Sequence, residues 1–168
     1  KSYVDSFEQV LHGDDFLNPE TGYRKYISVK SFIDFLITNE FSVNYDSYGR
    51  STYLYKEKIT NGNQLKIGPP WDYDRAYNDS PEGWVWEITH QGWPFPFWWS
   101  KMWDDPIYRK ELACRWFSLR QNTLSTHAFM SLIDSLSTEL NEAQARNFTI
   151  WNDLGGQTYN DQINGLKS

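Results

Sequence analysis

Three aspartates stand at the two ends of a segment that is expected to fold back on itself. Asp46 follows a strongly helical stretch, and Asp72 and Asp74 follow the second of two short apolar runs. Carboxylates that converge without a basic partner repel one another, and a hard divalent cation is the usual remedy. We therefore expect a divalent-metal site if the intervening chain brings these acids together.

The intervening chain has the pattern of a β-hairpin. Residues 51–57 alternate between two faces, Asn61-Gly62 supplies a turn, and residues 64–67 return as a second strand. The loop is longer than the tight two-residue form. Gly68-Pro69-Pro70 then ends the second strand, because proline cannot donate a hydrogen bond to a ladder. A hairpin of this kind places the acids before and after it at the same open end.

The protein-kinase template combines such parts in this order. A catalytic aspartate accepts the proton of the acceptor hydroxyl, a residue five positions later binds metal, a hairpin follows, and a second aspartate holds Mg²⁺. Here Asp46 takes the first position and Asp72 the second, and the residue five after Asp46 is Ser51, an oxygen ligand weaker than the template's Asn. Neither a His-Arg-Asp nor an Asp-Phe-Gly triplet is present. The alternative that Asp46 caps a turn and that residues 72–74 form a solvated loop therefore stays open on spacing alone.

Helical periodicity flanks the hairpin on both sides. The four expected helices are Tyr3 to Leu11, Ser28 to about Val43, Asp105-Pro106 to about Gln121, and Ser125 to about Phe148. In the helix from Ser28 the residues expected to face inward are Phe32, Phe35, Leu36 and Val43. In the helix from Asp105-Pro106 those expected to face partly inward are Ile107, Leu112, Cys114, Trp116 and Leu119. In the helix from Ser125 the residues expected to be buried are Phe129, Leu132, Ile133, Leu136 and Leu140. Cys114, the single cysteine, is interpreted as a small buried hydrophobe, and it excludes an internal disulfide.

These elements predict a helix-rich α+β fold with one prominent hairpin, in a single domain over residues 1–168. Residues 71–99 are rich in aromatic residues, glycine and proline and show little periodicity. A loop of such length inside a compact domain is usually functional or wrapped around a site.

The overall composition excludes several classes of protein. Hydrophobic residues make up 39% of the chain and aromatic residues 18%, far from the profile of a disordered chain. The net charge is −6 without a basic stripe, so nucleic acid is not an expected partner. No run of eighteen apolar residues is present, so no transmembrane segment is expected.

Several linked motifs resemble the CotH kinase family, the proteins related to spore coat protein H. The matching segments are Asp34 to Asp46, Ser51 to Lys56, and Leu65 to Asp74 with its Gly68-Pro69-Pro70-Trp71-Asp72 core, followed by Ala76-Tyr77-Asn78, Gly83-Trp84 and the helix from Asp105-Pro106 to Arg120. The similarity covers most of the chain from about Ser28 to Gln121. Asn39-Glu40 belongs to the matched motif, and these two residues are interpreted as fastening neighbouring backbone.

The resemblance implies an atypical, metal-dependent protein kinase that uses Mg²⁺ or Mn²⁺ and ATP to phosphorylate Ser or Thr of a protein substrate. It places the two functional aspartates at Asp46 and Asp72, with Asp74 as a second metal ligand, and leaves the role of Asn44 unassigned. The loop of this hairpin is three residues longer than is usual in the family, which a turn can absorb. Family habit also points to a secreted or cell-surface location.

One part of a kinase is missing from the pattern. In kinases the glycine-rich phosphate loop and the phosphate-binding lysine precede the catalytic aspartate. Only 45 residues precede Asp46, and they have the pattern of helix and loop. We therefore expect this chain to be the C-lobe of a CotH-like kinase domain with the N-lobe absent, and to transfer phosphate poorly by itself.

Two other functions remain open at this stage. A degenerate kinase fold would serve as a cell-surface or adhesion module. A carbohydrate-binding or carbohydrate-active domain is suggested by the tryptophans of the aromatic loop, which are Trp84, Trp86, Trp93, Trp98 and Trp99. Glycoside hydrolysis needs two acids set apart across a sugar, whereas the acids at 72 and 74 are more natural ligands of one ion.

Overall fold

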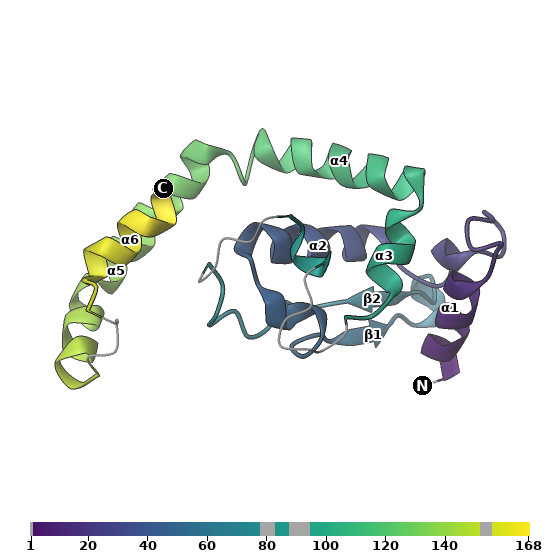
Figure 1. Ribbon diagram of the computed structural model, residues 1–168, viewed down its shortest axis with the longest axis horizontal. Helices are drawn as coiled ribbons and strands as arrows, with labels where there is room; N and C mark the ends of the chain where they lie inside the picture. The colour runs from purple at the N-terminus through teal and green to yellow at the C-terminus, as the bar shows by residue number, and fades with distance from the viewer. Residues whose placement is uncertain (1, 78–82, 88–94, 152–155) are drawn as a thin grey trace. The chain divides into compact units, whose positions relative to one another are not determined.

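The computed structural model describes residues 2–77, 83–87, 95–151 and 156–168. These residues group into two compact units, Lys1–Arg115 and Trp116–Ser168, and each is described by itself. The helices are α1 Ser2–His12, α2 Val29–Ser42, α3 Trp98–Trp103, α4 Pro106–Arg120, α5 Thr126–Ile150 and α6 Tyr159–Lys167, and the strands are β1 Leu54–Lys56 and β2 Leu65–Ile67 (Figure 1). Short 3-10 helices lie at Tyr23–Lys25, Tyr45–Tyr48, Ile59–Asn61 and Val85–Glu87. The predicted helix-rich α+β composition is confirmed.

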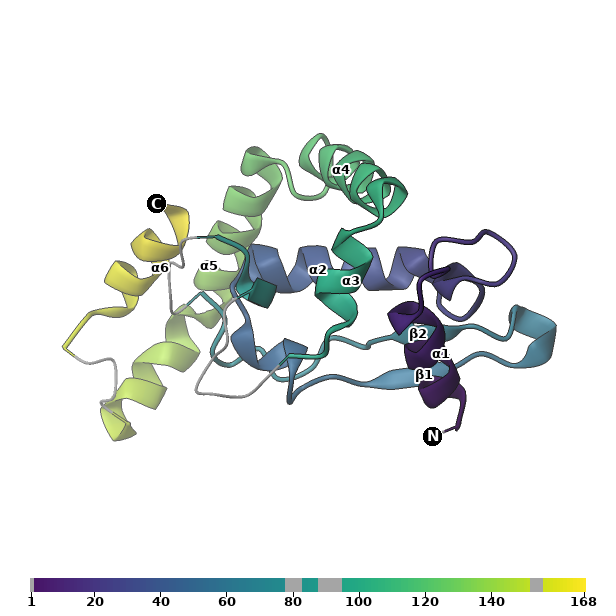
Figure 2. The ribbon, with the colours of Figure 1, turned by 45° about the vertical axis from the view of Figure 1, so that its right-hand side comes forward.

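The hairpin forms where the alternating pattern predicts it, although its strands are shorter than expected. β1 and β2 pair antiparallel with Leu54 opposite Ile67 and Lys56 opposite Leu65. The segment that leads into α2 also joins β2, since the Leu65 amide donates to the Tyr26 carbonyl (2.8 Å) and the Leu65 carbonyl accepts from the Ser28 amide (2.9 Å). Figures 1 and 2 both show α2 running along the hairpin. The start of α2 is thus tied directly to the second strand.

The core of the first unit is built from aromatic side chains of α1, α2 and α3. The Phe7 ring meets the Trp98 ring edge-on at 5.3 Å, and the Phe35 ring stacks on the Trp99 ring at 5.9 Å. Phe32 lies between α1 and α3 and is fully buried. The buried α2 stripe predicted from the sequence is confirmed at Phe32, Phe35 and Leu36, whereas Val43 lies just past the helix and is only partly buried. α3, which the aperiodic composition of the aromatic loop hid, supplies the other half of this core.

A buried carboxylate connects the start of α4 to the Tyr23–Lys25 turn. Asp105 is only 2% exposed and accepts hydrogen bonds from the Tyr23 hydroxyl (2.7 Å), from the Arg24 guanidinium (2.9 and 3.1 Å) and from the Ile107 amide (2.8 Å). Arg24 also pairs with Glu111, further along α4, at 3.0 Å. The predicted Asp-Pro helix start is confirmed, and its aspartate holds two distant segments together.

The inward face of α4 differs from the prediction. Tyr108 and Leu112, four residues apart on one face, are buried, whereas Ile107 is 58% exposed and Cys114 is exposed. Cys114 is two positions after Leu112, which rotates it about 200° around the helix axis, so it cannot lie on the same face as Leu112. The expectation of a buried cysteine is therefore wrong.

The second unit corrects the predicted core of α5. Of the five residues expected to be buried, Ile133 is buried, Leu132, Leu136 and Leu140 are about half exposed, and Phe129 is intermediate. α6 packs on a neighbouring face of α5, where the Tyr159 hydroxyl donates to the Ser137 carbonyl (3.3 Å) and Lys167 pairs with Asp134. A capping box between Thr158 and Asp161 begins α6, which the sequence analysis did not anticipate.

Within the described residues, none of the helices is both long enough and apolar enough to span a membrane.

Candidate functional site

Asp46 lies in the 3-10 helix Tyr45–Tyr48, directly after α2. Its backbone carbonyl accepts from the amides of Arg50 (2.9 Å) and Ser51 (3.0 Å), which closes a tight loop. Its carboxylate, 21% exposed, lies 4.0 Å from the Arg50 guanidinium and 3.9 Å from that of Arg75. Arg75 was not predicted as part of the site, although it lies directly after Asp74 in the sequence. The Asp46 carboxylate therefore has two arginine side chains as neighbours.

Asp72 meets the Asp46 loop through a side chain that the sequence predicted for this site. The Ser51 hydroxyl lies 3.2 Å from Asp72 Oδ2, and the Asn44 side-chain amide lies 3.4 Å from the Asp72 carbonyl. Asp72 itself has a positive φ of 63°, a conformation that side-chain-bearing residues adopt infrequently and that recurs at functional sites. The hairpin thus brings the two chain segments together, and Asp74 lies exposed in the turn that follows.

The oxygen atoms that meet are of the kind that bind hard cations. The described ranges contain no group of three or more His, Cys, Asp or Glu side chains placed to hold a metal ion. Mg²⁺, however, is usually held by one or two carboxylates together with water and substrate phosphates, so a carboxylate beside a hydroxyl fits it. Asn44 is 1% exposed, and in the described part of the chain its Oδ1 is buried and accepts no hydrogen bond. The loop therefore offers one further buried oxygen beside the backbone of Asp72.

The last turns of α2 fasten the segment that follows Asp72. The Tyr73 hydroxyl donates to Asn39 Oδ1 (2.6 Å), whose amide donates in turn to the Phe35 carbonyl (2.9 Å). The Tyr77 amide donates to the Ser42 carbonyl at 2.7 Å. These bonds hold the backbone on both sides of Asp74, so its position depends on α2.

Glu40 makes the second attachment to α2. Its carboxylate accepts from the Tyr48 hydroxyl (2.6 Å) and from the amides of Val85 (2.8 Å) and Trp86 (3.1 Å). Burial raises the pKa of the Glu40 carboxyl, and the nearby Glu87 adds to this, although the three hydrogen bonds act in the opposite direction. The interpretation of Asn39-Glu40 as residues that fasten neighbouring backbone is confirmed.

We expect Glu40→Gln to lower the free energy of unfolding by about 1–3 kcal/mol, because the amide nitrogen of Gln cannot accept the hydrogen bonds that a carboxylate oxygen accepts. The raised pKa means that the stability linked to Glu40 is fully present below its unfolded pKa, near 4.3, and declines as the pH rises through the folded value. The difference in free energy of unfolding between wild type and Glu40→Gln should therefore become smaller as the pH rises through that window. Urea unfolding across pH values measures this.

The matched control is Glu87→Gln, an exposed residue of the same segment, which should change stability by no more than about 0.5 kcal/mol. Equal effects of the two substitutions would contradict a specific role for Glu40.

Those tryptophans of the aromatic loop that the structure describes do not form an exposed row. Trp98 is 6% and Trp99 3% exposed, and both belong to the core. The rings of Trp84 and Trp86 both contact the Trp103 ring, with centroid separations of 5.0 and 5.7 Å. Trp93 and Asn78, which the sequence analysis also named, lie outside the described residues. Buried rings cannot stack on a sugar, so Trp98 and Trp99, two of the five tryptophans suggested for carbohydrate binding, cannot serve that role.

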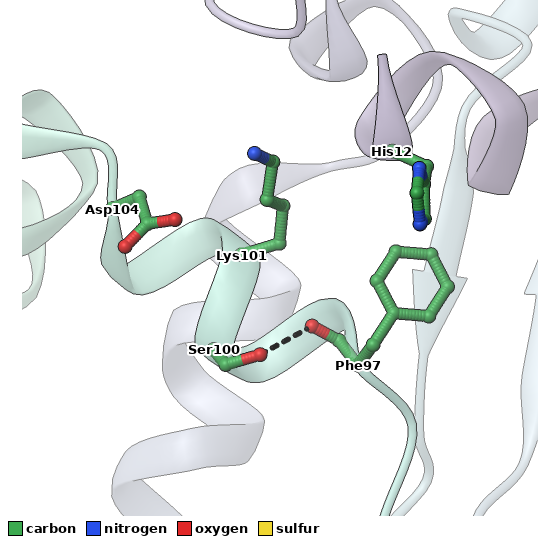
Figure 3. A pocket seen from close by; sticks show the side chains of 5 residues that line it. All are labelled: His12, Phe97, Ser100, Lys101 and Asp104. Atoms are coloured by element: carbon green, nitrogen blue, oxygen red, sulfur yellow. Dashed lines mark hydrogen bonds between the residues drawn. The ribbon is translucent and has the colours of Figure 1, made fainter. Parts of the chain in front are cut away.

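A pocket of about 240 Å³ lies elsewhere in the first unit, between the end of α1 and α3. It is lined by His12, Phe97, Ser100, Lys101 and Asp104 (Figure 3). The His12 ring meets the Phe97 ring edge-on, the Lys101 ammonium lies 4.1 Å from the centre of the Phe16 ring, and the Ser100 hydroxyl donates to the Phe97 carbonyl. None of the acids predicted for the metal site lines it, so it is separate from the Asp46–Asp72 region.

A family model described as CotH kinase protein matches residues 1–168, the whole chain. The match extends beyond the segment from Ser28 to Gln121 on which the resemblance rests. Comparisons with curated proteins and with solved structures gave no match.

Proposed function

Because the chain belongs to the CotH kinase protein family, we propose that it carries the catalytic and metal-binding part of a site that transfers phosphate from ATP to Ser or Thr of a protein. The observation that supports this proposal is the contact between the Ser51 hydroxyl and the Asp72 carboxylate, beside the loop that presents Asp46. This is the order of parts that phosphoryl transfer needs, with a proton acceptor and a cation site on neighbouring loops.

Each acidic residue has a distinct role in this proposal. Asp46 orients the acceptor hydroxyl and takes its proton, while Asp72 and Ser51 hold Mg²⁺ or Mn²⁺ and Asp74 serves as a second metal ligand. The cation, when bound, neutralises charge on the nucleotide phosphates. Arg50 and Arg75 lie about 4 Å from the Asp46 carboxylate, where they stand close enough to the site to attract phosphate oxygens.

Nucleotide binding by this chain depends mainly on the cation. The sequence before Asp46 contains no glycine-rich loop that would hold the phosphates with backbone amides. We therefore expect slow phosphate transfer by this chain alone.

The proposal is tested by thermal unfolding of the chain with Mg²⁺ or Mn²⁺, with and without ATP. A ligand that binds only the folded protein stabilises it by about 2.7 kcal/mol at 100 times its dissociation constant, so the melting temperature should rise with the cation and rise further with ATP. A parallel series with oligosaccharides tests the carbohydrate alternative.

The outcomes separate the three hypotheses. A melting temperature that rises with oligosaccharide and not with the cation would favour carbohydrate binding. No response to any of these ligands would contradict the proposed site and favour an adhesion module.

A further inference from the structure

Two exposed aromatic side chains lie beside the Ser51–Asp72 contact. Trp71 is 57% exposed and Tyr53 is 52% exposed, and their rings meet edge-on with centroids 6.2 Å apart. Trp71 directly precedes Asp72, and Tyr53 follows Ser51 by two residues. The same two segments are therefore joined twice, once by a polar pair and once by an aromatic pair. Two residues of extended chain span at most about 7 Å, so the two pairs are close neighbours.

The aromatic pair is held in place by the hairpin. The Tyr53 carbonyl accepts from the Gly68 amide at 2.9 Å, which extends the ladder of β1 and β2 by one residue pair. Tyr53 thus belongs to regular backbone, and Trp71 lies just beyond the end of the second strand. Large aromatic side chains bury much area when they are covered, so a paired set left half exposed beside a polar site is suited to contact with a ligand.

We propose that Tyr53 and Trp71 form the contact surface for the base of the nucleotide, an inference that rests on the proposed function. A nucleoside triphosphate carries an anionic end, which would bind a cation held by a carboxylate, and a flat ring, which an aromatic side chain contacts. The structure places these two chemistries side by side on segments 51–53 and 71–72. The acceptor hydroxyl, in contrast, is assigned to Asp46, and a sugar chain has no charged end to match the Asp72 site.

The experiment compares two ligands that share their phosphates and differ in the base. Calorimetric titration gives the dissociation constants of Mg²⁺–ATP and Mg²⁺–tripolyphosphate for the chain and its variants. We expect Trp71→Ala and Tyr53→Ala to weaken the binding of Mg²⁺–ATP roughly 5- to 100-fold, the range expected from loss of one base–aromatic contact. The dissociation constant of Mg²⁺–tripolyphosphate should stay within about twofold of the wild-type value. Asp72→Asn should weaken both ligands together.

Matched variants guard against a general structural effect. Trp71→Phe and Tyr53→Phe keep an aromatic ring and should retain most of the affinity for Mg²⁺–ATP. Trp151→Ala removes another tryptophan of similar exposure, 64%, and should change neither ligand.

The outcomes distinguish this inference from the proposal on which it rests. If both ligands bind and the two alanine variants weaken them equally or not at all, the base does not contact these rings and the inference is wrong, while the metal site stands. A third outcome is that Trp71→Ala abolishes binding of an acceptor peptide that contains an aromatic residue, while the ratio of the dissociation constants of Mg²⁺–ATP and Mg²⁺–tripolyphosphate is unchanged. The surface then serves the acceptor, and the inference is again wrong. Binding of neither ligand would overturn the proposed function and this inference together.

Discussion

Replacing Asp105 with alanine is expected to destabilise the protein by about 3–5 kcal/mol, because a buried donor left without its acceptor costs about 1–3 kcal/mol and hydrogen bonds to charged groups contribute about 1.5–3 kcal/mol. The carboxylate accepts four hydrogen bonds from Tyr23, Arg24 and Ile107 while almost completely buried. Its removal leaves the buried Tyr23 hydroxyl without this acceptor and part of the Arg24 guanidinium unpaired. For a chain of this size the melting temperature should fall on the order of 10 °C, as measured by calorimetry.

The neighbouring residue provides the control. Asp104 is exposed, and Asp104→Ala makes the same chemical change one position away, with an expected effect within about 0.5 kcal/mol. A loss of less than about 1 kcal/mol in Asp105→Ala would show that the buried network is not a significant source of stability.

The pH dependence gives a second check on Asp105. Burial acts to raise the pKa of its carboxyl, but the hydrogen bonds from Tyr23, Ile107 and Arg24 outweigh burial and hold the pKa below its ordinary value. The resulting stability is present above the unfolded pKa, near 4, and is lost as the pH falls through the folded value. The difference between wild type and Asp105→Ala should therefore shrink in acid below about pH 4.

Replacing Asp72 with asparagine is expected to remove the stabilisation by Mg²⁺ or Mn²⁺ almost completely. At a cation concentration 100 times the dissociation constant, this loss amounts to about 2.7 kcal/mol. The reason is that an amide lacks the negative charge that makes a carboxylate a ligand for hard cations. Thermal unfolding with and without the cation measures the difference, and the stability without cation should change little because Asp72 is exposed.

Two further variants divide the proposed roles. Asp74→Asn should reduce the response to the cation only in part, because Asp74 is proposed as a second ligand. Asp46→Asn should keep the response to the cation, since Asp46 is proposed to act on the acceptor hydroxyl. A full response in Asp72→Asn, or its loss only in Asp46→Asn, would contradict the assignment of the metal ligand.

Local pattern predicted the elements that frame the site. The apolar stripe of Phe32, Phe35 and Leu36 predicted α2, and Ser28 does precede its first residue. Alternation and the Asn61-Gly62 turn predicted the hairpin, and Pro106 begins α4 as its fixed backbone favours. These patterns depend on residues only a few positions apart, so they can be recognised in the sequence without knowledge of the fold.

Burial was less predictable than secondary structure. The apolar residues of α5 have helical spacing, yet three of the five expected to be buried are about half exposed, because the second unit covers a different face with α6. α3 was hidden for a related reason. Four of its six residues are large and apolar or aromatic, and a helix of six residues is too short to show a helical periodicity.

The sequence by itself determined which residues are candidates for the proposed chemistry, since the spacing of Asp46, Ser51 and Asp72 around a hairpin follows from local structure and from family motifs. The tertiary structure alone decided what surrounds them. It placed Arg75 beside Asp46, set Tyr53 against Trp71, and fastened the segment after Asp72 to α2 through Asn39, Ser42 and Glu40. These contacts join residues about 18 to 45 positions apart along the chain. Local propensity does not encode such pairings, because they depend on how the hairpin, α2 and the following loop pack together.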